Sequence, residues 1–414
     1  MNPKSVMKES ILFCGLMLYA LLYVSCEGRR PEKQAWQDVE LSPAERHIAE
    51  RNTAFAFRFF QEATQTDATC VLSPLSASCL LSLLMNGADG DCLAGMRTAL
   101  RLDSIPMETI NTYYNRLIKG LPFADPLTEV GLHQSLWIEE EVNIESTFRK
   151  VSHEEYNAEI CTVDFSAPDA TERVNRWCAE KTNNRITKVV DTFHGKERLA
   201  LLNALYFQGK WQREFNKEWT RPEPFTASDG TVRQVEMMCQ TDTFRLLRNE
   251  YFDIAELPYG NDSFSMILFL PAQDKDWETC RTSFTTENWL RWSEDGETRR
   301  LDLRLPRFRM EERYNLSTAL RALGMGKAFN PSIHHFPRLA KGELGIGEVL
   351  QSIFISVDEG GTEAAAATIA TIIAEEELPP SLRPYPFHVN RPFLFLIKEN
   401  KTGAILFMGQ VTKM

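Results

Sequence analysis

The segment over residues 359–374 constrains the fold of this chain more than any other, because it contains few large or charged side chains. It reads EGGTEAAAATIATIIA. Side chains alternate between the two faces of a strand, and from Thr362 every second residue is threonine, alanine or isoleucine. One face of such a strand can be buried without burying a charge. Because alanine favours helices over strands, the segment suits a loop, a helix or a strand inserted into a sheet.

The N-terminus predicts export. Basic residues precede an apolar run over residues 11–24, which is too short for an ordinary membrane-spanning helix and typical of a secretory signal. The run ends in LYVSC, which resembles a bacterial lipobox that is lipidated at Cys26, and ordinary cleavage near Ser25 is the alternative. We therefore expect a lipoprotein of the bacterial outer membrane or cell surface, or else a secreted protein. The predicted parts are a signal peptide (1–25), a tether (26–42) and a single domain (43–414).

Charge and motifs argue against a nucleic-acid partner and against catalysis. The chain has 46 basic and 57 acidic residues and a formal net charge of −11, which disfavours nucleic acid. It contains no nucleophile elbow, no His-Glu-x-x-His, no phosphate-binding glycine loop and no cysteine–histidine metal spacing. His388 and the other single histidines are interpreted as surface or core residues. We predict no catalytic residue, no metal, no cofactor and a monomer.

Cysteines are the last candidate for reactive chemistry. Nine cysteines less Cys14 and Cys26 leave seven in the predicted domain, with no Cys-x-x-Cys pair. Free cysteine packs as a small apolar side chain. We therefore predict seven buried thiols, and no spacing requires a disulfide.

Periodicity and caps predict the main elements. Residues 42–45, Ser-Pro-Ala-Glu, have the spacing of a capping box and begin a helix that ends near residue 62. A second predicted helix begins at residue 73, and a third spans residues 171–183. The predicted strands span 199–207 and 264–271, with a hairpin of 393–398 and 404–408. Helices followed by long strands indicate an α+β domain.

Several motifs, in order, resemble those of the serpin family of serine protease inhibitors. DEGGTEAAAAT at residues 358–368 resembles the hinge of a serpin reactive-centre loop. SPLS at residues 73–76 resembles the start of the shutter helix, and NALYFQGKW at residues 203–211 resembles the shutter and breach motif. NRPFLF at residues 390–395 resembles a closing strand. The resemblance, which covers residues 41–414, implies a serpin fold with three β-sheets, surrounding helices and an exposed reactive-centre loop.

The resemblance also implies roles for individual residues. The hinge would comprise Glu359, Gly360, Gly361, Thr362, Glu363, Ala364, Ala365, Ala366, Ala367 and Thr368. The shutter and breach would comprise Ser73, Ser76, Asn203, Trp211 and Gln351. Position 351 is usually histidine in the family, and glutamine here can keep the hydrogen bonds but not the pH sensitivity.

The activity implied by the resemblance is inhibition of serine endopeptidases, with papain-like cysteine endopeptidases as further candidates. The protease cleaves the loop and is trapped as an acyl-enzyme when the loop inserts into the central sheet. The alternative is a non-inhibitory serpin that acts as a binding or structural envelope protein.

The reactive bond follows from the family's hinge spacing. Counting from Glu359 places it between Glu375 and Glu376, which favours a glutamyl-specific protease. A slip of one or two residues gives Ala374 or Ile373, which favours elastase-like or subtilisin-like proteases. A trypsin-like alternative is Arg383, in an unusually long proline-rich return arm.

Overall fold

The computed structural model describes residues 37–64, 68–293, 295–330, 335–362 and 383–414. Gln37–Met414 forms one compact unit. Within the predicted tether, Gln37 donates its backbone N–H to the Phe123 carbonyl at 3.2 Å, and Val39 and Leu41 are buried. The last residues before the first helix therefore pack on the domain.

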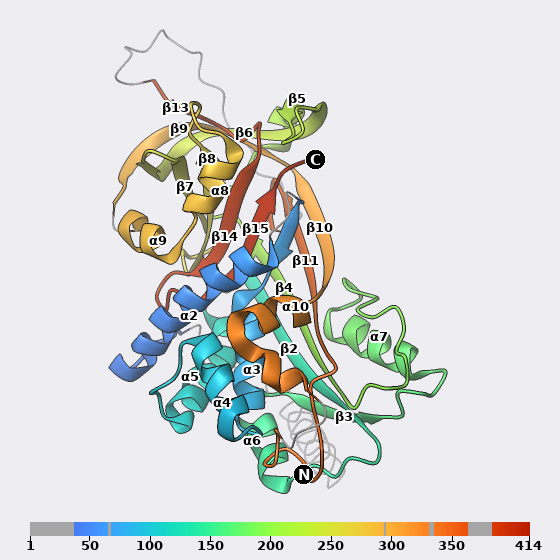
Figure 1. The fold of residues 1–414 in the computed structure, drawn as a ribbon. Coiled ribbons are helices and arrows are strands. Elements are labelled where there is room, and N and C mark those ends of the chain that lie inside the picture. The colour runs from blue at the N-terminus through green and yellow to red at the C-terminus, as the bar shows by residue number, and fades with distance from the viewer. Residues whose placement is uncertain (1–36, 65–67, 294, 331–334, 363–382) are drawn as a thin grey trace, which may run out of the picture. The chain divides into compact units, whose positions relative to one another are not determined.

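The helices lie mostly in the first half of the chain (Figure 1). They are α2 (Pro43–Ala63), α3 (Pro74–Met85), α4 (Gly90–Leu100), α5 (Met107–Gly120), α6 (Ser146–Tyr156), α7 (Ala170–Lys181), α8 (Trp277–Ser283), α9 (Thr286–Ser293) and α10 (Ser317–Leu320). Short helical turns are η1 (Leu121–Phe123), η2 (Lys217–Trp219), η3 (Arg321–Met325) and η4 (Gly326–Phe329). The predicted capping box is confirmed, because the Ser42 hydroxyl accepts from the Glu45 N–H and the Glu45 carboxylate accepts from the Ser42 N–H.

A nine-stranded sheet forms one of the two sheets in the described part of the chain. Its order is β1 (Cys70–Leu72), β15 (Ile405–Val411), β14 (Phe393–Glu399), β8 (Phe264–Pro271), β7 (Phe252–Tyr259), β6 (Val232–Arg248), β9 (Glu297–Pro306) and β13 (Tyr385–His388), with β5 (Arg221–Thr226) paired to β6. Three sheets were expected. The long strand β6 accounts for the difference, because it pairs with β5 at one end, with β7 at the other and with β9 between.

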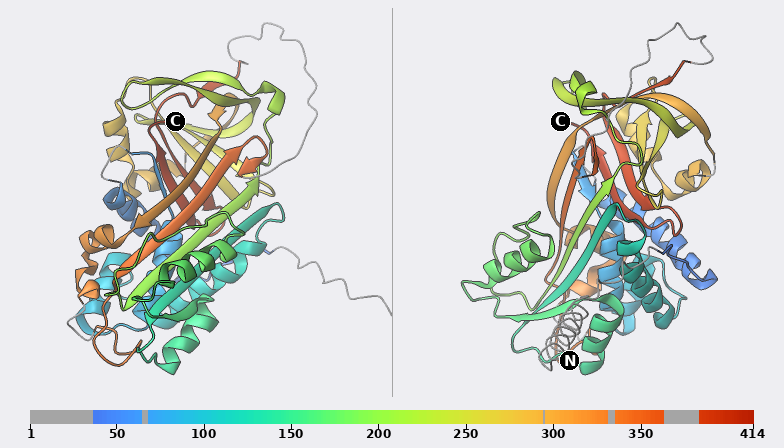
Figure 2. Two further views of the ribbon diagram at one scale, coloured as in Figure 1. Left: turned by 90° about the vertical axis from the view of Figure 1, so that its right-hand side faces the viewer. Right: turned by 180° about the vertical axis from the view of Figure 1, so that it is seen from behind.

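The second sheet has six strands and carries the hinge. Its order is β10 (Phe308–Asn315), β11 (Glu348–Asp358), β12 (Gly361–Thr362), β4 (Leu199–Lys210), β2 (Thr128–Glu139) and β3 (Glu159–Val163), with a further pairing of β11 and β4. Helix α7 covers one face, and the helices of the first half, α3 among them, lie behind the other (Figure 2). Side chains on β4 alternate accordingly: Leu201 joins the main core, whereas Ala200 and Leu202 join a second core beneath α7.

The predicted α+β class is confirmed, and each predicted helix and strand is present with its ends shifted by a few residues. The strand predicted over residues 199–207 extends to Lys210. Among the described residues, no helix is long and apolar enough to span a membrane.

Candidate functional site

Strands β4 and β11 are parallel neighbours that part at one end. They pair from Ala200 opposite Glu348 to Tyr206 opposite Phe354. Beyond that point β12 lies between them and pairs antiparallel with both. The chain therefore begins a new strand at the mouth of the β4–β11 seam, the line along which these two strands meet.

Two amide side chains from the seam hold the start of α3. The Gln351 side chain accepts from the Ser73 backbone N–H and donates to the Ser73 carbonyl, both at 3.0 Å. Asn203 donates to the Ser76 carbonyl at 2.8 Å and accepts from the Ser76 hydroxyl. All four residues are buried. The residues predicted as the shutter are thus brought together, and Gln351 makes two hydrogen bonds here.

The first strand residue of the hinge tolerates no side chain. Gly361 has φ of +147°, and a Cβ built there would lie 2.0 Å from the Gly209 carbonyl oxygen. Such a backbone conformation strongly favours glycine. Next to it, Thr362 is fully buried, and its hydroxyl shares a 2.8 Å hydrogen bond with the phenol of Tyr259. Burial raises the pKa of Tyr259, so the phenol stays neutral.

Trp211 connects the hinge to the nine-stranded sheet. Its ring stacks on that of Tyr259 with centroids 4.3 Å apart. Its indole N–H donates to the Asp358 carbonyl and its backbone N–H to the Gly360 carbonyl, both at 2.9 Å. The breach around Trp211 therefore fixes the backbone on both sides of Glu359.

Glu359 itself is a buried carboxylate, with 2% of its surface exposed. It accepts a hydrogen bond from the Thr220 hydroxyl at 2.6 Å and forms an ion pair with Arg307. Burial raises the pKa of Glu359, but the Thr220 and Arg307 contacts outweigh burial, so the pKa lies below its usual value. No sequence pattern pointed to Tyr259, Thr220 or Arg307 as partners of the hinge.

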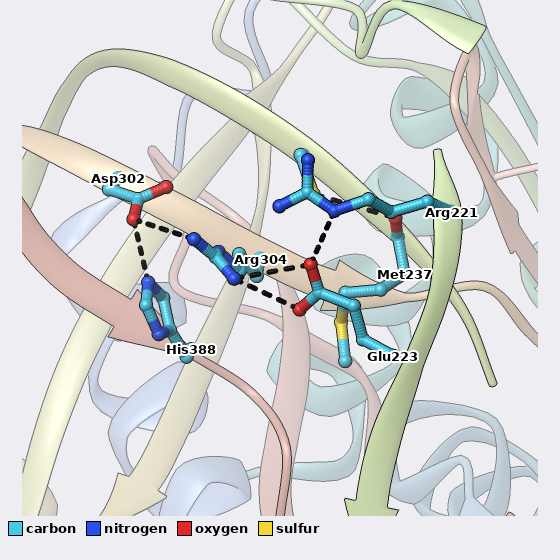
Figure 3. A network of polar contacts seen from close by, with 7 residues as sticks. Arg221, Glu223, Met237, Asp302, Arg304 and His388 are labelled. Atoms are coloured by element: carbon cyan, nitrogen blue, oxygen red, sulfur yellow. Dashed lines mark hydrogen bonds and ion pairs between the residues drawn. The ribbon is translucent and has the colours of Figure 1, made fainter. Parts of the chain in front are cut away.

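A second polar network fixes the chain where the described residues resume after the loop. β13 pairs with β9 through four residues, from Tyr385 to His388. His388 lies 2.7 Å from Asp302, which also contacts Arg304, and Arg304 binds Glu223 at 3.1 Å (Figure 3). The hydrogen bond from His388 lowers the pKa of Asp302. The sequence had marked this histidine only as single and unpatterned.

Several predicted site residues lie outside the described residues. They are Cys26, Glu363, Ala364, Ala365, Ala366, Ala367, Thr368, Ile373, Ala374, Glu375 and Glu376. Among the described cysteines all seven are free, and six are buried as predicted, whereas Cys161 is half-buried. In the described ranges, no group of three or more histidine, cysteine or acidic side chains is arranged to hold a metal ion.

Comparison with known proteins places the chain in a family. A family model described as serpin (serine protease inhibitor) matches residues 50–414. The leukocyte elastase inhibitor of Equus caballus is 30% identical over 383 residues, which are 88% of this chain and 98% of that protein. The native structure of tengpin, a thermophilic serpin, matches with a TM-score of 0.83 and 26% identity over 92% of this chain and 96% of that one.

A second solved structure is similar to this chain in fold, at lower sequence identity. Human thyroxine-binding globulin, solved with its hormone, matches with a TM-score of 0.81 at 22% identity, covering 89% of this chain and 99% of that one. The family model extends through the residues predicted as shutter, breach and closing strands, and the two solved structures match in fold over 92% and 89% of this chain. The chain therefore belongs to the serpin family.

Proposed function

We propose that this serpin is a suicide-substrate inhibitor of serine endopeptidases, which traps the acyl-enzyme by inserting its cleaved loop between β4 and β11. One observation carries the proposal: β12 already pairs with both strands at the mouth of the seam. A loop released by cleavage would extend this strand. Papain-like cysteine endopeptidases, which also form an acyl-enzyme, are further candidate targets.

The observed register supports insertion of the small-residue face. Thr362 lies opposite Gly209 on β4 and opposite Val357 on β11. In an antiparallel pair the numbers of opposite residues have a constant sum, which is 571 for β12 with β4 and 719 for β12 with β11. Continued in this register, Thr368 comes opposite Asn203 (571 − 368) and Gln351 (719 − 368). Val357 lies in the main core, so Thr362 and every second residue after it face that core. A threonine hydroxyl would thus arrive beside the two shutter amides, with only alanine methyl groups between it and Thr362.

The free energy of insertion is sufficient to hold a protease in a distorted state. Each new backbone hydrogen bond contributes about 1 kcal/mol net, and each buried CH₂ group about 0.8 kcal/mol. A strand of roughly a dozen residues therefore gains on the order of 10 kcal/mol. Deacylation fails when the oxyanion hole and the general base lose alignment.

The protease class depends on the reactive bond. A bond between Glu375 and Glu376 favours a glutamyl-specific enzyme, whereas Ala374 or Ile373 favours an elastase-like or subtilisin-like one. The name of the leukocyte elastase inhibitor, a relative at 30% identity, supports including elastase among the first enzymes tested.

The proposed location is the bacterial cell envelope, through lipid on Cys26. The support is the lipobox-like end of the apolar N-terminal run. Metabolic labelling with a fatty acid would test it, because a Cys26→Ser variant should lose the label. Label retained by that variant would contradict the proposal, and a secreted unlabelled wild type would favour ordinary signal cleavage.

The proposed inhibition is tested by incubating the protein with glutamyl-specific, elastase-like, subtilisin-like and trypsin-like proteases. We expect an SDS-resistant complex with at least one of them, and the mass of the released C-terminal peptide identifies the reactive bond. Thr362→Arg should convert the inhibitor into a substrate, because the buried site beside Tyr259 has no room for a charged side chain. Thr231→Arg, at an exposed threonine, is the control.

The alternative, a non-inhibitory serpin that binds a ligand or has a structural role, predicts the opposite results. Cleavage of the loop would release active protease, would leave the melting temperature unchanged, and Thr362→Arg would behave as wild type. These results together would reject inhibition.

A further inference from the structure

A cavity of about 620 Å³ lies where β13 meets the ends of β6, β7 and β8. Its wall includes Tyr385 and Pro386 from β13, Leu270 from β8, and Arg391 just before β14. The volume falls in the range of small-molecule sites, which are about 300–1,000 Å³. The cavity lies outside the β4–β11 seam, and the proposed inhibitory mechanism does not use it.

Arg391 is a half-buried cation that forms no ion pair with an acidic side chain of the described residues. Its Nε and Nη2 donate to the Pro271 carbonyl at 3.2 and 2.6 Å, and its Nη1 donates to the Asn390 side chain at 3.3 Å. These bonds use three of the five guanidinium N–H groups, which leaves two. Burial lowers the pKa of Arg391, and the charge of nearby Asp253 offsets this effect only in part. A buried guanidinium with unused donors favours an anion.

The other charged groups that line the cavity already have partners. Arg248 pairs with Asp253 at 3.1 Å, Lys275 with Asp274 at 3.5 Å, His388 with Asp302 at 2.7 Å and Glu250 with Arg291 at 3.6 Å. Among the described lining residues, Arg391 is the one cation that forms no ion pair within 4 Å, although Asp253 acts on it at longer range. A ligand should therefore present one carboxylate to this side of the cavity.

Tyr385 forms an aromatic part of the cavity wall. The guanidinium groups of Arg248 and Arg299 lie over the Tyr385 ring, 4.9 and 5.0 Å from its centroid, and the Tyr385 hydroxyl donates to Asp253 at 2.8 Å. The Asn249 side-chain oxygen accepts the backbone N–H groups of Tyr251 and Phe252 at 2.8 Å, and its buried Nδ2 has no hydrogen-bond partner among the described residues. The contacts of Tyr385 hold its side chain in place, so this part of the cavity wall is formed before any ligand binds.

We propose that this cavity binds a small organic carboxylate, whose oxygens accept the two unused N–H groups of Arg391. The bound anion contacts β13 on one side and the end of β8 on the other. β13 pairs with β9 through only four residues. Occupancy therefore holds the strand that follows the reactive loop in its sheet.

The test is calorimetric titration of the whole protein with sodium succinate, at ionic strength matched with sodium chloride. The neutral succinamide, which has the same length, is the control ligand. We expect saturable binding of succinate at one site and at least about tenfold weaker binding of succinamide. Equal binding of the two ligands, or no heat beyond the chloride control, overturns the proposal.

Variants locate the site. Arg391→Gln should weaken succinate binding at least tenfold, whereas Arg149→Gln, at an exposed arginine on α6, should not. Since Arg391→Gln also removes bonds to Pro271, a second variant, Ala272→Leu, fills the cavity and leaves Arg391 in place. Wild-type affinity in both cavity variants would reject this site.

Hydrogen exchange tests the effect on β13. Saturating succinate should slow exchange of the backbone amides of Tyr385, Phe387 and His388 more than that of the β14 amides. Succinate binding that leaves β13 exchange unchanged would overturn the stabilising role of the ligand.

Discussion

Gln351 and Asn203 lie directly opposite each other on β11 and β4, yet each binds α3 rather than the other. Gln351 holds the backbone of Ser73, and Asn203 holds Ser76. The start of α3 therefore bridges the two strands. Separating β4 from β11 must break these buried hydrogen bonds or move the helix, so the bridge keeps the seam closed.

Removal of the Gln351 side chain should destabilise the native fold. In Gln351→Ala the buried N–H of Ser73 loses its partner, and the Ser73 carbonyl keeps only the bond from the Ala77 N–H, so we expect the free energy of unfolding to fall by about 1–3 kcal/mol. Urea titration followed by circular dichroism measures the loss. Gln234→Ala, at an exposed glutamine, should change it by less than about 0.5 kcal/mol, and equal effects of the two variants would contradict the bridging role.

Glu359 should make stability depend on pH in the acid range. Because its pKa is lowered in the folded state, its contribution is complete above the ordinary value of 4.5 and is lost as the pH falls through the folded pKa. Glu359→Gln should lower the free energy of unfolding at pH 7 by about 1–2 kcal/mol, since half-exposed Arg307 is partly compensated by water.

The pH profile distinguishes this role from simple loss of packing. The stability difference between wild type and Glu359→Gln should be constant from pH 7 to 5 and narrow below about 4.5. The exposed Glu236→Gln variant should show no such profile. A difference that stays constant at low pH would show that the carboxylate charge does not contribute.

The pair of His388 and Asp302 should limit local opening of β13. Asp302→Asn keeps the shape but removes the charge that His388 contacts at 2.7 Å. We expect amide exchange in β13 to become about two- to fivefold faster, which corresponds to the usual strength of a partly exposed polar contact. Mass spectrometry of the peptide containing Tyr385–His388 measures it, with the exposed Asp295→Asn as control; unchanged exchange would mean that strand pairing alone holds β13.

Cys161 should be the first of the seven described thiols to react. It is half-buried on β3, whereas the other six are buried. Burial and the nearby Glu159 raise its pKa, so alkylation should be slow at neutral pH and faster above pH 9. Iodoacetamide pulses followed by peptide mapping test the order, and earlier labelling of any buried cysteine would indicate opening elsewhere in the domain.

Sequence reasoning worked where the signal is local. The capping box at Ser42 and the apolar run over residues 264–271 each predicted an element that the structure contains. The shutter residues were named through ordered motifs that resemble the serpin family, and the structure brings Asn203 and Gln351 opposite each other.

Contacts between distant segments were not predictable. Arg307 and Thr220 are 52 and 139 residues from Glu359 in the chain, and nothing in their neighbourhoods marks them as its partners. The same holds for His388, which is 86 residues from Asp302. The joining of two expected sheets through β6 likewise depends on where a single long strand pairs, which residue patterns do not specify.

The second core beneath α7 would affect the rate of any loop insertion. Its members include Leu202 on β4 and Leu350 on β11, so the α7 side chains rest on both sides of the seam. A strand added there would widen the sheet by about 4.8 Å, and α7 could not keep both sets of contacts. Tighter packing of this core stabilises the resting protein but delays insertion. If the protein traps proteases as proposed, the packing beneath α7 helps to decide whether insertion precedes deacylation, although this core is distant from the residues that a protease recognises.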